Sequence, residues 1–196
     1  KNPLSSDLNA MRQTLLFNGL EAIERNVNRQ NPNLKLFEFG NVYRLSGESS
    51  GEDKLSNYNE SERLALFITG GERVYWRGKR AASDFYQLKG YLETILERLG
   101  LNIESFNWSD AASDLFIEGA TLELPPKREK RALLTMGRVG DKLLKEFDIK
   151  QEIYAAEIDW SLLRSLLTGE AKEFKELPRF PYVTRDLALL VDHSVT

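Results

Sequence analysis

The sequence predicts an α+β fold, in which helices flank a mostly antiparallel sheet. Short stretches rich in β-branched and aromatic residues follow one another along the chain, as expected for successive strands. Segments with the apolar spacing of a helix interrupt them only at wide intervals, which favours this class. The composition fits a globular domain, because 41% of the 196 residues are hydrophobic and 29% are charged.

The first helix is expected within residues 11–32, with Thr14 as its N-cap and Pro32 at its end. Gly19 weakens this helix by about 1 kcal/mol relative to alanine, which indicates close packing against a neighbouring backbone. One apolar stripe runs along the helix at positions i, i+4, i+7 and i+11, and consists of Leu16, Leu20, Ile23 and Val27.

Two strands are expected next, over residues 34–45 and 62–71. The segment between them, residues 46–61, is rich in serine, glycine and asparagine and is therefore expected to be a flexible loop. The two strands are predicted to pair as a hairpin with a long tip.

The clearest helix pattern lies within residues 83–101. Ser83 or Asp84 is expected to cap its start, and Gly100 stands where a C′ glycine ends a helix. The predicted apolar face consists of Phe85, Leu88, Leu92, Ile95, Leu96 and Leu99.

The remainder of the first domain contains further strands and two short helices. The strands are expected at residues 103–108, 120–126, 131–140 and 152–159, and the helices at residues 141–147 and 159–167. Glycine, two prolines and a charge run then break the pattern, so a domain boundary is expected near residue 172. Residues 173–196 are interpreted as a linker and the first strand of a second, truncated unit, so the chain is expected to be an excerpt of a longer protein.

Several kinds of site are excluded by composition. Without cysteine, the chain cannot form a disulfide framework or a cysteine zinc site, and with His193 as its single histidine it cannot form a histidine metal cluster. No metal site is therefore predicted. A formal charge of -3 argues against a strong nucleic-acid clamp, although a local basic patch could still touch RNA. No apolar run reaches the roughly 18 residues of a membrane span, so no membrane role is expected.

Five segments, in this order along the chain, resemble the β-subunit family of bacterial phenylalanyl-tRNA synthetases. They are "NPLSSDLNAMRQTLLFNGLEAIERNVNRQ", "LKLFEFGNVY", "DFYQLKGYLETIL", "YAAEIDWSLL" and "RFPYVTRDLALLVD". The resemblance implies that residues 1–172 form a non-catalytic core similar to class II aminoacyl-tRNA synthetases. Residues 173–196 would then begin a ferredoxin-like anticodon-binding domain.

The resemblance also implies partners and chemistry. The holoenzyme, a cytoplasmic α2β2 assembly, would use ATP and magnesium to attach phenylalanine to its tRNA, with the chemistry in the α subunit. No cofactor and no catalytic residue are expected in this chain. Two other hypotheses are a class II-like paralogue that binds a nucleotide or an amino acid, and a stand-alone RNA-binding module.

Residue roles follow from the same resemblance. Arg44 lies where a class II enzyme places a phosphate-binding arginine, but Ser46 replaces the glutamate expected two residues later, so Arg44 is interpreted as vestigial. The first helix occupies the position of a class II dimer interface, and its stripe could equally be ordinary core. The interface candidates are Arg12, Leu16, Leu20, Ile23 and Val27.

A basic run, residues 125–131, is the remaining candidate region. Its cations could contact tRNA phosphates, and a solvated hairpin turn is the alternative. The candidates for tRNA contact are Lys127, Arg128, Lys130 and Arg131.

Overall fold

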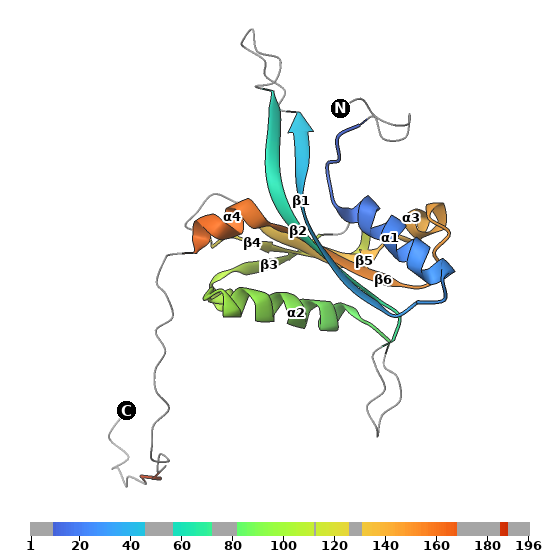
Figure 1. The fold of residues 1–196 in the computed structure, drawn as a ribbon. Coiled ribbons are helices and arrows are strands. Elements are labelled where there is room, and N and C mark those ends of the chain that lie inside the picture. Colours follow the sequence, from blue (N-terminus) through green and yellow to red (C-terminus); the bar gives the residue numbers. More distant parts are fainter. Residues whose placement is uncertain are drawn as a thin grey trace.

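A six-stranded, entirely antiparallel sheet organises the chain, in the order β1-β2-β6-β5-β4-β3 (Figure 1). The strands are β1 (Leu34–Leu45), β2 (Tyr58–Thr69), β3 (Asn107–Asp110), β4 (Phe116–Glu123), β5 (Ala132–Val139) and β6 (Ile153–Asp159). The computed structural model describes residues 10–45, 57–71, 82–111, 113–125, 131–167 and 185–187. The predicted α+β class and antiparallel sheet are confirmed.

Among the described residues, four helices pack on the two faces of this sheet (Figure 1). They are α1 (Leu16–Asn28), α2 (Phe85–Arg98), α3 (Asp141–Glu146) and α4 (Trp160–Leu166), and a 3-10 turn, η2, lies at Ile103–Ser105. Helices α1 and α3 share one hydrophobic cluster, and α2 and α4 share the other. Within the described ranges, no helix is both long and apolar enough to cross a membrane.

The central strands separate two hydrophobic cores. On β2, Ala65 and Phe67 pack into the core beneath α1, whereas Leu64 and Ile68 pack into the core beneath α2. Successive side chains of a strand point to opposite faces, so a central strand with helices on both sides is apolar at nearly every position. Strand β6 is buried at almost every position for the same reason.

The predicted hairpin and the ends of the second helix are confirmed. Strands β1 and β2 pair antiparallel from Leu34 opposite Thr69 to Leu45 opposite Tyr58. The carboxylate of Asp84 accepts the N–H of Gln87 at 2.7 Å and caps α2. At its other end Gly100 has φ +89°, and the chain closes the helix with a Schellman pair of hydrogen bonds.

The predicted cap of the first helix was wrong by one residue. Helix α1 has Leu15 as its N-cap, whose own side chain makes no capping hydrogen bond, while the hydroxyl of Thr14 accepts the N–H of Leu16 at 3.1 Å. The carboxylate of Glu157 on β6 accepts the N–H of Leu15 at 2.9 Å and the hydroxyl of Thr14 at 2.6 Å. The acceptor for the Leu15 N–H therefore comes from a residue 142 positions away in the sequence, which a local capping rule cannot anticipate.

Several element boundaries also differ from the prediction, among them the start of β4, which begins at Phe116 and not at residue 120. Residues 103–105, expected in a strand, form η2, because the side chain of Asn102 accepts the N–H of Glu104 and starts a turn. Strand β2 begins at Tyr58, so its first residues lie in the segment that was expected to be a loop. Long-range pairing with β1 extends the strand over polar residues that carry little strand signal.

The boundary near residue 172 lies outside the described residues, as does the tip of the hairpin at 46–56. Of the second unit, the structure describes only residues 185–187.

Candidate functional site

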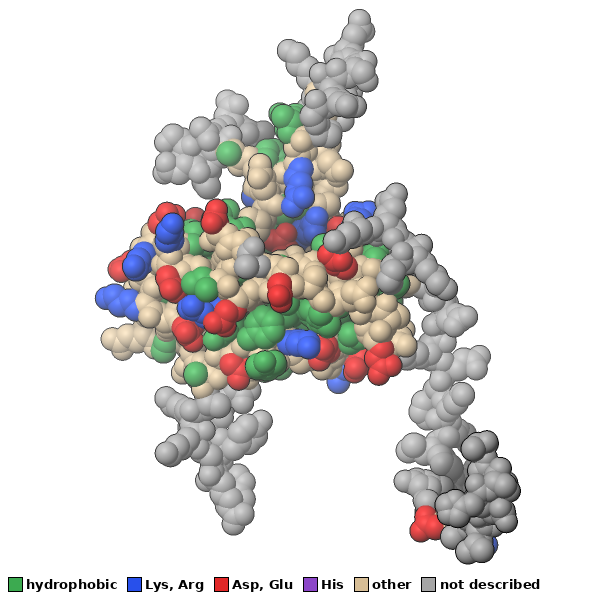
Figure 2. Space-filling view, turned by 180° about the vertical axis from the view of Figure 1, so that it is seen from behind, with side chains coloured by type: hydrophobic (Ala, Val, Ile, Leu, Met, Phe, Trp, Pro, Cys, Tyr) green, Lys and Arg blue, Asp and Glu red, His purple; other side chains and the backbone are tan. Residues whose placement is uncertain are grey.

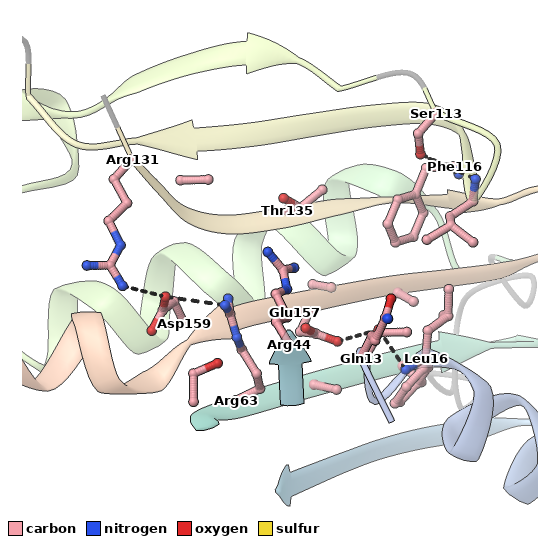
Figure 3. A pocket seen from close by; sticks show the side chains of 18 of the residues that line it. Gln13, Leu16, Arg44, Arg63, Ser113, Phe116, Arg131, Thr135, Glu157 and Asp159 are labelled. Atoms are coloured by element: carbon pink, nitrogen blue, oxygen red, sulfur yellow. Dashed lines mark hydrogen bonds and ion pairs between the residues drawn. The ribbon is translucent and has the colours of Figure 1, made fainter. Parts of the chain in front are cut away.

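A cavity of about 490 Å³ opens on the face of the sheet that carries α1. Strands β1, β2, β5 and β6 supply most of its wall. The remaining lining comes from the segments before α1 and β4, from Leu16 and Phe116 at the start of these two elements, and from Arg131 just before β5 (Figure 3). Residues from most of the length of the described chain therefore meet at this cavity.

The strand register arranges the lining in rows. Arg63 of β2 lies opposite Asp159 of β6, and two residues further along, Ala65 lies opposite Glu157. The next pair on the same face is Phe67 opposite Ala155. Because side chains directly opposite each other share a face, the cavity is charged at one end and apolar at the other.

The charged end is built on Asp159. Its Oδ2 pairs with the guanidinium groups of Arg131 at 3.3 Å and Arg63 at 3.4 Å, as Figure 3 shows. Its Oδ1 accepts the N–H of Leu162 at 2.9 Å and so caps α4. The side chain is only 3% exposed, so this one carboxylate pairs with two cations where little water reaches it, and it also caps a helix.

Arg63 depends on this carboxylate. Its side chain is 16% exposed, and its Nε is buried without a hydrogen-bond partner among the described residues. A desolvated guanidinium is costly unless an anion lies next to it, and Asp159 supplies that anion.

The apolar end lies between the sheet and the start of α1. Leu16 of α1 and Phe116 of β4 line it together with Phe67 and Ala155. Phe67 is held in place by close contact with α1, since a Cβ added to Gly19 would overlap its ring. The close packing predicted for Gly19 is thus present, but its neighbour is a side chain and not a backbone.

Arg44 lies in the lining of the same cavity. It stands opposite Asn59, which also lines the cavity, and in Figure 3 its side chain points over the sheet toward the cavity's middle. Among the described residues no acceptor forms a hydrogen bond or an ion pair with Arg44. Arg44 therefore faces the cavity together with Arg131, which was a candidate for tRNA contact, and Arg63, which was not predicted from the sequence.

The sequence profile described as "Phenylalanyl tRNA synthetase beta chain CLM domain" matches residues 1–160. The chain belongs to this family. Curated relatives include the phenylalanine–tRNA ligase β subunit of Bacteroides thetaiotaomicron, which is 43% identical over 99% of this chain. The β subunit of Porphyromonas gingivalis is 38% identical over 100% of this chain. The chain spans only 24% of each of these relatives.

A solved structure supports the fold of this family member. The pyrrolysyl-tRNA synthetase of Desulfitobacterium hafniense superposes with a TM-score of 0.53 at 18% identity, over 79% of this chain and 49% of that protein. At this identity the likeness shows the fold alone, and that fold is the core of the class II aminoacyl-tRNA synthetases. The predicted class II-like core and the predicted family are both confirmed.

The apolar stripe of α1 lies in this chain's own core. Leu16 is 4% exposed, Leu20 and Ile23 are fully buried, and Val27 packs against the same cluster. These side chains therefore pack as ordinary core residues, which was the alternative interpretation of the stripe. A contact between α1 and another subunit would have to use the opposite face of the helix.

Arg12 is fixed across β1. Its guanidinium pairs with Glu38 at 2.7 Å, and its Nε donates to the carbonyl of Asn41 at 2.9 Å. The side chain crosses the strand at Gly40, where an added Cβ would overlap the guanidinium. Through these contacts Arg12 attaches the segment before α1 to the edge strand β1.

The basic run is only partly described. Lys127, Arg128 and Lys130 lie outside the described residues, and Arg131 is half exposed while its guanidinium pairs with Asp159. On the face that Figure 2 shows, acidic and basic side chains are interspersed over the body of the molecule. In the part of the chain that the structure describes, no group of three or more potential ligands could hold a metal ion.

Sequence reasoning missed Arg63, Glu157 and Asp159. The sequence did indicate that Glu157 and Asp159 lie on the same face, because they are two residues apart in a predicted strand. Which face they share, and that Arg63 lies opposite Asp159, depends on the pairing of β2 with β6.

Proposed function

We propose that this chain is the non-catalytic module of a phenylalanine–tRNA ligase β subunit, which lies against the α subunit and supports bound tRNA. The observation that carries this is the match of residues 1–160 to the family, together with relatives that are β subunits of that ligase. In this proposal the cytoplasmic α2β2 holoenzyme attaches phenylalanine to tRNA with ATP and magnesium, and the α subunit performs the chemistry.

The charges of the cavity support a non-catalytic role. Adenylate formation requires cationic groups that are free to bind phosphates. Here two of three arginines are already paired with Asp159, and Glu157 adds a second carboxylate to the lining. One net positive charge does not match the several negative charges of ATP, and the described residues offer no cluster for magnesium.

This part of the proposal is tested by calorimetric titration of the chain with ATP and magnesium. We expect no binding in the micromolar range. Micromolar binding that disappears on Arg44→Ala would contradict the non-catalytic role and favour a nucleotide-binding paralogue.

The surface proposed for the α subunit is the outer strand β1. Phe37 is 72% exposed and Phe39 is 48% exposed, and Phe39 contacts Trp160 edge to face with ring centroids 4.9 Å apart. Exposed aromatic side chains of this kind are typical anchors of protein interfaces. Phe39 stands opposite Leu64 of β2, so this surface lies on the face of the sheet that carries α2 and α4, whereas α1 packs on the other face.

Co-purification with the α subunit tests the interface. Phe37→Ser in the assembled enzyme is expected to reduce recovery of the α subunit at least severalfold, because it removes an exposed anchor without opening the core. Tyr86→Ser on α2, where the tyrosine is 77% exposed, is the matched control and should leave recovery unchanged. Equal recovery with both variants would exclude this surface.

Support of tRNA is proposed for the basic run. Replacing Lys127, Arg128 and Lys130 by glutamate in the assembled enzyme should weaken tRNA binding and lower its salt dependence by roughly one unit per lost phosphate contact. The control replaces Lys142, Lys145 and Lys150, exposed residues in and just after α3, in the same way. An unchanged salt slope in the first variant would indicate a solvated turn instead.

A further inference from the structure

The cavity beside α1 has a shape and polarity that the proposed function does not use. Its apolar end is formed by Phe67, Ala155, Leu16 and Phe116, and Arg44 and Arg63 lie toward the other end. Arg63 and Phe67 are four positions apart on β2, which is about 13 Å along an extended strand. A volume of about 490 Å³ is within the range of small-molecule sites.

The charges at the polar end limit what can bind there. Arg131 and Arg63 are both paired with Asp159, so the guanidinium of the lining that is left to recognise a ligand is that of Arg44. One oxygen of Glu157, Oε2, accepts two hydrogen bonds from the segment before α1, and its carboxylate repels further negative charge. The lining as a whole therefore favours a ligand with one negative charge over a polyphosphate.

Arg44 suits a planar monoanion. A guanidinium offers parallel N–H donors that match the two oxygens of a carboxylate. Its side chain is directed over the sheet toward the middle of the cavity (Figure 3). A ligand held by Arg44 would extend its other end toward the ring of Phe116 and the side chain of Leu16.

We propose that this cavity binds a small monocarboxylate with an apolar body, its carboxylate on Arg44 and its apolar part against Phe67 and Phe116. The site goes beyond the proposed function and does not depend on it. Most of its wall is the sheet itself, and the start of α1 and the segment before β4 close its apolar end.

Calorimetric titration of the 196-residue chain with matched probes tests this site. We expect 4-phenylbutanoate to bind about tenfold or more tightly than butanoate, because only the former fills the apolar end. It should also bind more tightly than 4-phenylbutylamine, which has the same carbon skeleton and the opposite charge. Equal affinity for the acid and the amine, or no binding of 4-phenylbutanoate, would overturn the proposal.

Variants place the ligand in the cavity. Arg44→Gln should weaken binding of 4-phenylbutanoate about tenfold, and Arg44→Lys should recover part of the loss. Arg164→Gln is the matched control, since it removes one arginine charge from α4 outside the cavity lining and should have no effect. Amide chemical shifts should change at Ala65, Thr135 and Glu157, and changes confined to other strands would refute the assignment.

The two proposals fail separately. Absence of carboxylate binding leaves the α-subunit contact at Phe37 standing, because co-purification does not use the cavity. Loss of that contact in turn leaves the titration unaffected.

Discussion

At the scale of single residues, Asp159 links the sheet to a helix and to two cations. Its Oδ1 caps α4 through the N–H of Leu162, and its Oδ2 compensates Arg63 and Arg131. The two functions can be separated, because asparagine retains a capping oxygen and lacks the charge.

Asp159→Asn is expected to lower the free energy of unfolding by about 2 to 3 kcal/mol, since it leaves the largely covered guanidinium of Arg63 without its anion. Asp159→Ala should cost about 1 kcal/mol more, because it also removes the cap. Urea denaturation measures both. Asp84, the N-cap of α2, is the control, because among the described residues it has no arginine partner, so Asp84→Asn should be nearly neutral. Equal stability of Asp159→Asn and the parent would show that Asp159 contributes only a cap.

Tyr154 gives a second residue-scale prediction, on pH dependence. Burial raises the pKa of its phenol above the ordinary 10.0, and the carboxylate of Glu152, which accepts its hydroxyl at 3.2 Å, raises it further. As the pH rises past about 10, the unfolded chain loses this proton before the folded chain does, so the free energy of unfolding falls.

Tyr154→Phe removes this contribution, and the decline in stability above pH 10 should become shallower. Denaturant unfolding at a series of pH values between neutrality and the alkaline limit measures the slope. Tyr86→Phe, at an exposed position, controls for loss of a hydroxyl group. A parent and a Tyr154→Phe variant with parallel alkaline slopes would contradict the assignment.

At the scale of elements, helices α1 and α2 each contain a glycine, and only one of the two is required by packing. The Cα of Gly19 faces the ring of Phe67, whereas a Cβ on Gly90 would meet no atom within 4 Å. Phe67 is only 2% exposed and packs in the core beneath α1, so its ring has little room to move away.

The two Gly→Ala substitutions should therefore change stability in opposite directions. Gly90→Ala is expected to stabilise by about 0.5 to 1 kcal/mol, the gain in helix propensity. Gly19→Ala should destabilise by about 1 to 3 kcal/mol, because overpacking outweighs the same gain. Thermal unfolding of the two variants gives the comparison, and a stabilising Gly19→Ala would mean that α1 can shift away from β2.

At the scale of the whole molecule, stability is concentrated where the two cores meet. Strands β2 and β6 lie inside the sheet and contribute to both clusters, whereas β3 is a four-residue strand at its edge. Opening β6 exposes both cores, but opening β3 exposes little apolar surface.

Hydrogen exchange should follow this gradient. Amides of β6 are expected to exchange only through global unfolding, and those of β3 should exchange at least a hundredfold faster through local opening. Mass spectrometry of peptides that cover the two strands measures the difference. Similar protection in β3 and β6 would show that the sheet opens only as a unit.

Local sequence signals determined the elements of this protein. The 3.6-residue spacing of Leu88 and Leu92, the Asp84 cap and Gly100 placed the second helix within a residue or two, because helix periodicity and caps are local. The antiparallel hairpin of β1 and β2 followed from two adjacent apolar strands in the same way. Arg44 was also selected from the sequence, through the family resemblance, and it does line the cavity.

Only the tertiary structure decided what surrounds these elements. The acceptor at the start of α1 is Glu157, the neighbour of Gly19 is the Phe67 ring, and the partner of Arg63 is Asp159. Each pair joins residues far apart in the chain, and strand register is set by the packing of both faces of the sheet at once. The sequence therefore determines which segments become helices and strands, while the charge and shape of the cavity arise only when those strands lie side by side.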